Sequence, residues 1–132
     1  MAKPMTHAFS SVKTFGGSFK DYIDIHNFMD DSKSVFADNR HRALTHNSWF
    51  VNHVIEKVFG VFITNTDGKN VSTKAIAEQH ILEDFGGKFI PTAQDYLQEI
   101  DYKPWMNGNG FPASRLKIEE KTNSKFIPFS ND

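Results

Sequence analysis

Residues 38–46 read DNRHRALTH, and this stretch decides both the expected fold and the place to look for function. It packs an acid, two arginines and two histidines into a segment that otherwise reads as one amphipathic helix. On a helix, residues four apart share a face, so Arg42 and His46 project together and Asp38 extends the same stripe. His41 aligns instead with Leu44 and Val51, which predicts that its imidazole points toward the core.

The flanking sequence predicts further helices, which together form a mainly α fold of about four helices. Capping-box residues open a short first helix at Ser18 and a fourth helix at Thr92. The longest predicted helix begins at a Ser32 cap and ends at Gly60, with a bend near Asn47. A broad apolar stripe along these residues supports the prediction. The expected helices span residues 18–29, 32–60, 72–85 and 92–100.

One small β-hairpin is predicted between the second and third helices. Residues 61–64 are β-branched and aromatic, and an Asp67-Gly68 turn precedes Val71. From residue 107 onward the composition changes to Gly, Pro, Asn, Ser and Lys with little periodicity. We therefore expect a single domain, with residues 1–106 forming a helical body with a pocket rich in His and Asp, and residues 107–132 forming an irregular tail.

Composition fits one folded domain with a substantial core. A chain of 132 residues buries roughly 68–70% of its unfolded surface. The sequence contains 13 phenylalanines, which predicts an aromatic core. It contains no cysteine, so disulfides, thiol nucleophiles and thiolate metal sites are excluded.

Charge and hydropathy exclude several classes of partner. The formal net charge is −1, and basic and acidic residues are mixed, so no cationic stripe supports nucleic acid or an anionic membrane as partner. No signal-like segment and no run of about 20 apolar residues is present. The expectation is a soluble cytoplasmic protein without a membrane segment and with an undetermined oligomeric state.

Histidines and carboxylates recur at helical spacing along the chain. His26 with Asp30, and His80 with Asp84, each place an imidazole beside a carboxylate. Such pairs either hold a divalent metal ion, whose identity the sequence leaves open, or transfer protons. The candidate metal ligands are His7, His26, His41, His46, His80 and Asp84, and the candidate catalytic residues are Arg40, Arg42 and Glu78.

No established catalytic motif accompanies these residues. The chain has no HExxH, no adjacent His-Asp dipeptide, no glycine-rich phosphate loop before a helix and no GxSxG. Arg40 and Arg42 can clamp a phosphate, or they can pair with Asp38 and Glu78, which we slightly favour. A polar network that only fixes helix packing therefore stays open as an alternative.

Several polar blocks resemble a known family. These blocks are HAFSSVK at 7–13, DNRHRALTH at 38–46, TNTDGK at 64–69 and EQHILEDFG at 78–86. They look like a family of small bacterial and phage proteins known only as a domain of unknown function. The resemblance runs from His7 to Met106 and implies a phage or prophage protein that acts in the host cytoplasm. Members often carry a second His after the position of His46, whereas this chain has Asn47, so that position is not expected to be an essential ligand.

Three functions follow as hypotheses. The first is a metal-dependent hydrolase of phosphoesters or nucleotides, in which an arginine steadies anionic charge. The second is a non-catalytic phage protein that sequesters a nucleotide signal or inhibits a host protein. The third is an interaction protein whose polar network is structural. The expected partner is therefore a small phosphorylated ligand or a host protein.

Overall fold

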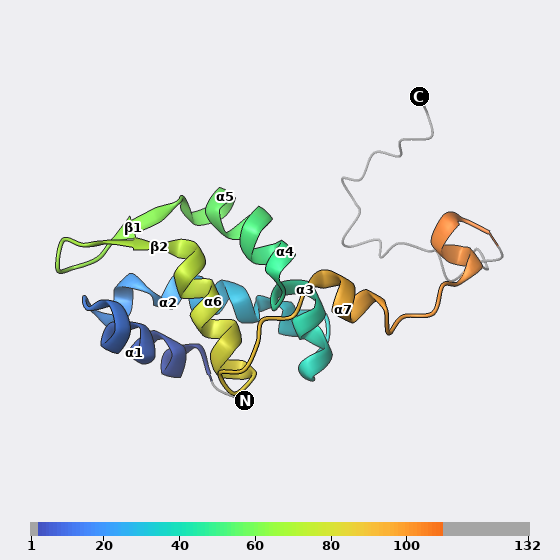
Figure 1. Ribbon diagram of the computed structural model, residues 1–132, viewed down its shortest axis with the longest axis horizontal. Helices are drawn as coiled ribbons and strands as arrows, with labels where there is room; N and C mark the ends of the chain where they lie inside the picture. Colours follow the sequence, from blue (N-terminus) through green and yellow to red (C-terminus); the bar gives the residue numbers. More distant parts are fainter. Residues whose placement is uncertain (1–2, 110–132) are drawn as a thin grey trace, which may run out of the picture. The chain divides into compact units, whose positions relative to one another are not determined.

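A computed structural model describes residues 3–109 and shows a mainly helical protein with one two-stranded antiparallel hairpin (Figure 1). This confirms the predicted fold class. The chain divides into two compact units, residues 1–99 and residues 100–132. In the second unit the structure describes a 3-10 helix, η5 (Pro104–Asn107), which ends at Gly108 in the left-handed conformation. Most of the predicted tail lies outside the described residues.

The first helix, α1 (Pro4–Phe15), was not predicted from the sequence. Pro4 occupies the first turn, where its missing N–H costs nothing, and Gly16 ends the helix with φ +84°. Its buried residues are His7, Ala8 and Ser11. Because two of these three are polar, apolar periodicity gives no signal for the helix.

The capping box at Ser18 and Asp21 is present, but it opens the 3-10 helix η1 (Phe19–Asp21), which leads into α2 (Ile23–Asp30). Burial on α2 follows helical spacing, so one face of the helix turns inward. That face carries two apolar and two polar side chains, Ile25, Met29, His26 and Asp30. The predicted first helix is therefore confirmed in place, and its buried face is half polar.

The predicted long helix over residues 32–60 is wrong as a continuous element. The chain instead forms 3-10 turns η2 (Asp31–Ser34) and η3 (Asn39–His41), then a short α3 (Arg42–Thr45). Asn47 adopts an extended backbone, and its side chain accepts a hydrogen bond from the Phe50 N–H. This cap starts a new helix. The new helix comprises α4 (Ser48–Phe50), a π-helical stretch η4 (Val51–Ile55) and α5 (Glu56–Phe59).

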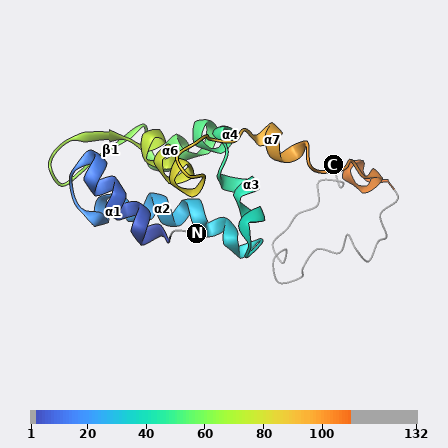
Figure 2. The same ribbon diagram turned by 60° about the horizontal axis from the view of Figure 1, so that its bottom comes forward.

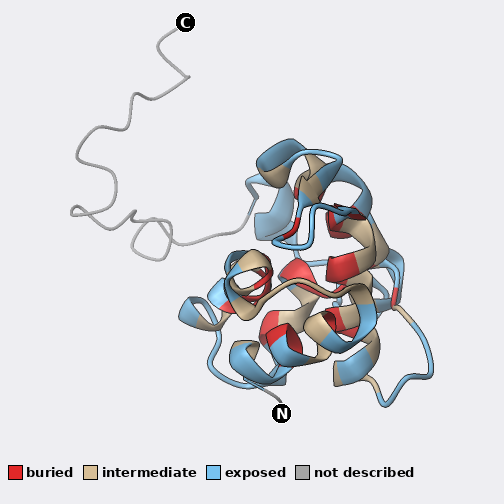
Figure 3. Cartoon of the chain, turned by 90° about the vertical axis from the view of Figure 1, so that its left-hand side faces the viewer, coloured by how far each residue is buried: buried red, intermediate tan, exposed pale blue. Residues whose placement is uncertain are grey.

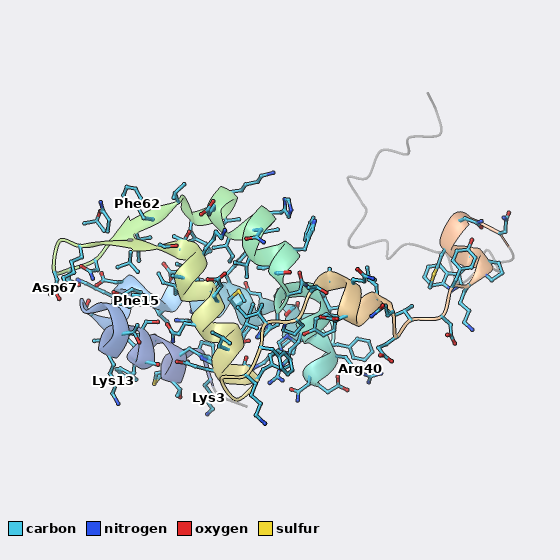
Figure 4. The ribbon with its side chains drawn as sticks, viewed as in Figure 1. Lys3, Lys13, Phe15, Arg40, Phe62 and Asp67 are labelled. Carbon is cyan, nitrogen blue, oxygen red and sulfur yellow. The ribbon has the colours of Figure 1, made fainter. Side chains whose placement is uncertain are left out.

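The hairpin forms where the sequence predicts it. Strand β1 (Phe62–Thr64) pairs antiparallel with β2 (Asn70–Ser72), with Ile63 opposite Val71. Asp67, at the turn of the hairpin (Figure 4), accepts a hydrogen bond of 2.9 Å from the Gly17 N–H. Gly17 has φ +76°, and a Cβ there would lie 2.5 Å from Asp21 Oδ2, so only glycine fits this contact.

The hairpin leads directly into α6 (Thr73–Asp84), whose N-terminus is capped by the Ser72 side chain. Helix α6 packs against α1, α2 and the helix of residues 48–59 (Figures 1 and 2). The predicted capping box at Thr92 and Asp95 opens α7 (Ala93–Leu97), which is shorter than expected. The central position of α6 lets its residues meet side chains from several other helices.

Buried residues gather on the facing sides of these helices (Figure 3). Two apolar clusters result, and their members are mostly aliphatic. One contains Met29, Phe50, Val51, Ile55, Ala77 and Ile81, and the other contains Ala8, Tyr22, Ile25, Val71 and Ile76. Among the described phenylalanines, Phe50 is 9% exposed and belongs to a cluster, whereas five others pack partly buried against the clusters: Phe15, Phe19, Phe28, Phe59 and Phe85. The expected aromatic core therefore forms mainly as a partly buried layer around aliphatic side chains. Within the described residues, no helix is long and apolar enough to cross a membrane.

Candidate metal centre

Five histidines are completely buried in the described part of the chain. Such burial is unusual for so many titratable side chains in one small domain. They come from α1, α2, α6 and the segment around α3, and they are His7, His26, His41, His46 and His80. These are the histidines that the sequence singles out, and His53, on the exposed side of η4, is not among them.

Two histidines and two aspartates direct one donor atom each to a common point. The atoms are His46 Nε2, His80 Nε2, Asp30 Oδ1 and Asp84 Oδ2, and all lie within 4.8 Å of one another. From His46 Nε2 the distance is 2.9 Å to Asp84 and 3.7 Å to Asp30. From His80 Nε2 it is 3.2 Å to Asp30 and 3.4 Å to Asp84. We call these four residues the His2Asp2 centre.

The size of the His2Asp2 centre is compatible with a first-row divalent cation. A tetrahedron with metal–ligand bonds of about 2.0–2.1 Å has six edges of about 3.3–3.4 Å. The four His–Asp edges, from 2.9 to 3.7 Å, bracket that length, and the remaining two edges are at most 4.8 Å. The two carboxylates also supply two negative charges, which a divalent cation balances. A nitrogen and oxygen donor set without sulfur suits zinc, manganese, iron or nickel.

Hydroxyl groups fix the tautomer of His46. Thr45 Oγ lies 2.8 Å from the Met29 carbonyl, which can only accept, so the hydroxyl donates its single proton there. Thr45 Oγ must then accept from His46 Nδ1, 2.8 Å away. The Nδ1 of His46 therefore carries the proton. In the neutral imidazole this leaves an unprotonated Nε2 facing the Asp84 carboxylate.

A second chain of hydrogen bonds fixes His80 in the same way. Ser11 Oγ donates to Gln79 Oε1 at 2.6 Å, so it accepts from His26 Nε2 at 2.7 Å. With its proton on Nε2, neutral His26 accepts at Nδ1 from His80 Nδ1, 2.9 Å away. His80 thus also presents Nε2 to the two carboxylates. Outer hydrogen bonds of this kind are what orient metal-ligating histidines.

Electrostatics keep His46 and His26 neutral. Burial lowers the pKa of His46 to about 4, although the hydrogen bond to Asp84 raises it in part. Burial, followed by the charge of His80, lowers the pKa of His26 to about 3. At neutral pH the His46 Nε2 lone pair and the Asp84 carboxylate are then two acceptors 2.9 Å apart. A cation between them resolves this contact.

Without a metal, protonated His80 supplies the positive charge that balances the carboxylates of Asp30 and Asp84. Burial opposes its protonation, but hydrogen bonds to Asp30 and Asp84 outweigh burial and raise its pKa. Burial likewise opposes ionisation of Asp84, but the adjoining imidazoles of His46, His7 and His80 hold its pKa well below the usual range. Asp30 follows the same pattern through His80. A metal and a proton would therefore compete for His80.

His7 lies against the centre without supplying one of the four donor atoms. Its Nδ1 is 2.7 Å from Glu83 Oε1, and its ring stacks on His80 with 3.8 Å between centroids. Its Nε2 lies 3.2 Å from Asp84 Oδ1. Three buried atoms here have no hydrogen-bond partner, namely His7 Nε2, Asp84 Oδ1 and Asp30 Oδ2. Buried polar atoms without a hydrogen bond next to the His2Asp2 centre are compatible with a bound cation there.

The remaining predicted site residues lie outside the His2Asp2 centre. His41 is buried with Nδ1 2.7 Å from Ser32 Oγ, and its Nε2 lacks a partner. Arg40 is exposed and paired with Asp38, whereas Arg42 is half-buried over the Phe85 ring. Glu78 precedes His80 by two residues and so occupies a different face of α6. No Arg42–Glu78 ion pair forms among the described residues, so that expected pairing is wrong.

Asp30 is the member of the centre that the sequence-based ligand set omits. Helical spacing places Asp30 on the same face as His26, but the predicted set of metal ligands contains only His26 of this pair. In the structure the roles are exchanged, because Asp30 contributes a donor atom while His26 supports His80. The supporting residues Ser11, Thr45 and Glu83 were also not predicted. Their roles depend on how α1, α2, α3 and α6 pack together.

Comparison with known proteins places this geometry in a family. A family model described as a domain of unknown function, DUF6915, matches residues 2–106. The chain belongs to DUF6915. No curated protein and no solved structure matches the chain. Membership of DUF6915 confirms the expectation of an uncharacterised family, and it brings no named activity, so function must follow from the centre itself.

Proposed function

We propose that this protein binds one divalent transition-metal ion at the His2Asp2 centre and uses it to hydrolyse phosphoesters or nucleotides. The observation that supports metal binding is the tautomer pattern. Two separate hydrogen-bond chains, through Thr45 and through His26, place a proton on Nδ1 of both ligand histidines, so that each turns Nε2 toward the two carboxylates. At neutral His46 this brings a lone pair and the Asp84 carboxylate face to face, an arrangement that a bound cation would relieve and that a purely structural network does not need.

Hydrolysis would combine the centre with its neighbours. A divalent cation supplies Lewis acidity and makes water a stronger nucleophile. His7, oriented through Nδ1 by Glu83, places Nε2 beside Asp84, where it can hold or move a proton. Glu83 is itself held by Ser10 and Gln79. A partly exposed carboxylate thus connects the buried imidazole to the surface.

A second function is supported by the burial of the ligands. The side chains of His46, His80, Asp30 and Asp84 are exposed by only 0, 0, 6 and 1%. Four protein ligands fill a tetrahedral shell, which is typical of structural metal sites, whereas catalytic sites keep one position open. In this reading the metal stabilises a non-catalytic protein that captures a phosphorylated ligand or a host protein.

The first test is elemental analysis of tag-free protein purified without chelators. The parent protein should carry about one metal ion per chain, and His80→Ala should lose it because a ligand is removed. His53→Ala is the matched control, since His53 is exposed and contacts only the Trp49 ring among the ring contacts of the described residues. A parent protein that stays metal-free after incubation with zinc, manganese, iron and nickel would contradict the proposal.

Assays of the metal-loaded protein with bis(p-nitrophenyl) phosphate and a nucleotide panel separate the two functions. Turnover that EDTA removes, and that His80→Ala lacks while His53→Ala retains it, is expected for the hydrolase. Retained metal without turnover, combined with a fall in melting temperature on chelation, would reject hydrolysis and leave the structural role. Ligand stabilisation without consumption would identify a capture protein.

A further inference from the structure

The two arginines that flank His41 have opposite environments. Arg40, at the outer edge of the molecule (Figure 4), donates to both carboxylate oxygens of Asp38 at 2.8–3.1 Å. It also lies over the Phe36 ring. Arg40 is therefore already neutralised by a neighbouring acid. Exposed pairs of this kind contribute little to stability.

Arg42 has no such acid. Its guanidinium lies 5.1 Å from the centre of the Phe85 ring, and its Nε is buried without a hydrogen bond. Within residues 3–109 no carboxylate lies within ion-pair distance of it. A half-buried cation loses hydration without gaining a counter-charge, and an aromatic face restores only part of that loss.

Arg42 also belongs to the short helix α3 that leads into His46 of the His2Asp2 centre. It is one helical turn before His46, whose N–H donates to the Arg42 carbonyl at 2.7 Å. The Tyr96 hydroxyl donates to the His46 carbonyl at 3.0 Å.

We propose that Arg42 binds a phosphate-class oxyanion, the anionic group of the substrate, at the edge of the His2Asp2 centre. The guanidinium fork matches two oxygens of such a group and supplies charge-assisted hydrogen bonds. The inference rests on the proposed function for the nearby metal, and it deepens that function by assigning the group that recognises the substrate. The competing role for Arg42 is a cation–π contact that only fixes Phe85.

Calorimetric titration with inorganic phosphate tests the assignment in Arg42→Met and in the matched control Arg40→Met. Both variants remove one guanidinium from neighbouring positions of the same segment. Arg42→Met should weaken phosphate binding about 10- to 100-fold, because hydrogen bonds to a charged group are lost. Arg40→Met should leave it unchanged, and elemental analysis should find the metal content of both variants equal to that of the parent.

Each titration is run on metal-loaded and on EDTA-treated protein, since phosphate can also bind a metal directly. If the parent protein retains no metal and the EDTA-treated protein still binds phosphate through Arg42, the proposed metal function is rejected and the anion site is supported. If the parent protein retains metal but Arg42→Met and Arg40→Met bind phosphate equally tightly, the anion site is rejected and the proposed metal function is unaffected. Acetate binding as tight as phosphate binding would overturn the phosphate class.

A folding control completes the design. Circular dichroism establishes whether Arg42→Met keeps the parent's helix content. If that variant does not fold, Arg42→Lys is used, which keeps the charge and the stem but removes the fork. A folded Arg42→Lys with about tenfold weaker phosphate binding supports the assignment. Unchanged affinity, or a parent protein that binds no phosphate at millimolar concentration, overturns it.

Discussion

Replacing Asp84 by asparagine is expected to release the metal and to lower the free energy of unfolding by about 3–5 kcal/mol. Asp84 faces His7, His46 and His80 at 3.2, 2.9 and 3.4 Å. The amide keeps the shape of the side chain but removes the charge that all three imidazoles contact. The loss is large because breaking a buried ion pair leaves the partner uncompensated.

Urea denaturation with and without EDTA measures both effects of Asp84→Asn. In the parent protein, metal at a hundredfold excess over its Kd contributes about 2.7 kcal/mol of stability that EDTA removes. Asp84→Asn should show no EDTA effect. Asp24→Asn is the control, because Asp24 is an exposed aspartate on α2. An Asp84→Asn protein that keeps its metal and unfolds like Asp24→Asn would refute the centre.

Thr45→Val should reduce metal affinity about 10- to 100-fold although Thr45 is not a ligand. The substitution removes the oxygen that accepts from His46 Nδ1 and donates to the Met29 carbonyl. His46 is then free to turn or to change tautomer. We also expect an unfolding cost of about 2–5 kcal/mol, because several buried polar groups lose a partner.

Competition with a chromophoric chelator measures the metal affinity of Thr45→Val. Thr64→Val makes the same chemical change at an exposed hairpin position, where the hydroxyl bonds only to Asn70 Oδ1. This control should bind metal like the parent. If Thr45→Val also binds like the parent, the hydroxyl does not orient His46, and the tautomer argument for the metal is lost.

Local sequence signals predict those elements whose caps and turns lie in the sequence itself. The hairpin was predicted from its Asp67-Gly68 turn, and α6 lies within the helix predicted at residues 72–85. In contrast, α1 was missed because its inward face is largely polar, and apolar periodicity cannot detect a helix that packs on histidines. Helices whose buried face is polar are therefore difficult to predict from apolar periodicity.

The long predicted helix failed for a related reason. Its apolar stripe continued across Asn47, so periodicity alone suggested one element with a bend. The side chain of Asn47 instead accepts the Phe50 N–H and starts a new helix. The break matters for the centre, because the separate segment around α3 carries His46 toward α6.

The candidate site was predictable by residue type more than by role. His46, His80 and Asp84 were named as metal ligands, and the structure brings a donor atom of each into the His2Asp2 centre, although metal binding itself stays a prediction. Helical spacing shows that His26 and Asp30 share a face, but it cannot decide which of them reaches a common point with other helices. That choice depends on how α2 meets α6.

The spacing of the donors along the chain would set a time order for the proposed metal binding during synthesis. Asp30 and His80 lie 50 residues apart, and His46 and Asp84 lie 38 apart. Because the chain is made from its N-terminus, Asp30 and His46 leave the ribosome well before α6. A nascent chain therefore offers half of the ligand set for much of its synthesis and cannot close the centre until residue 84 is made. The ion would therefore bind only after all four ligands have been synthesised. A cell short of metal would accumulate the metal-free protein.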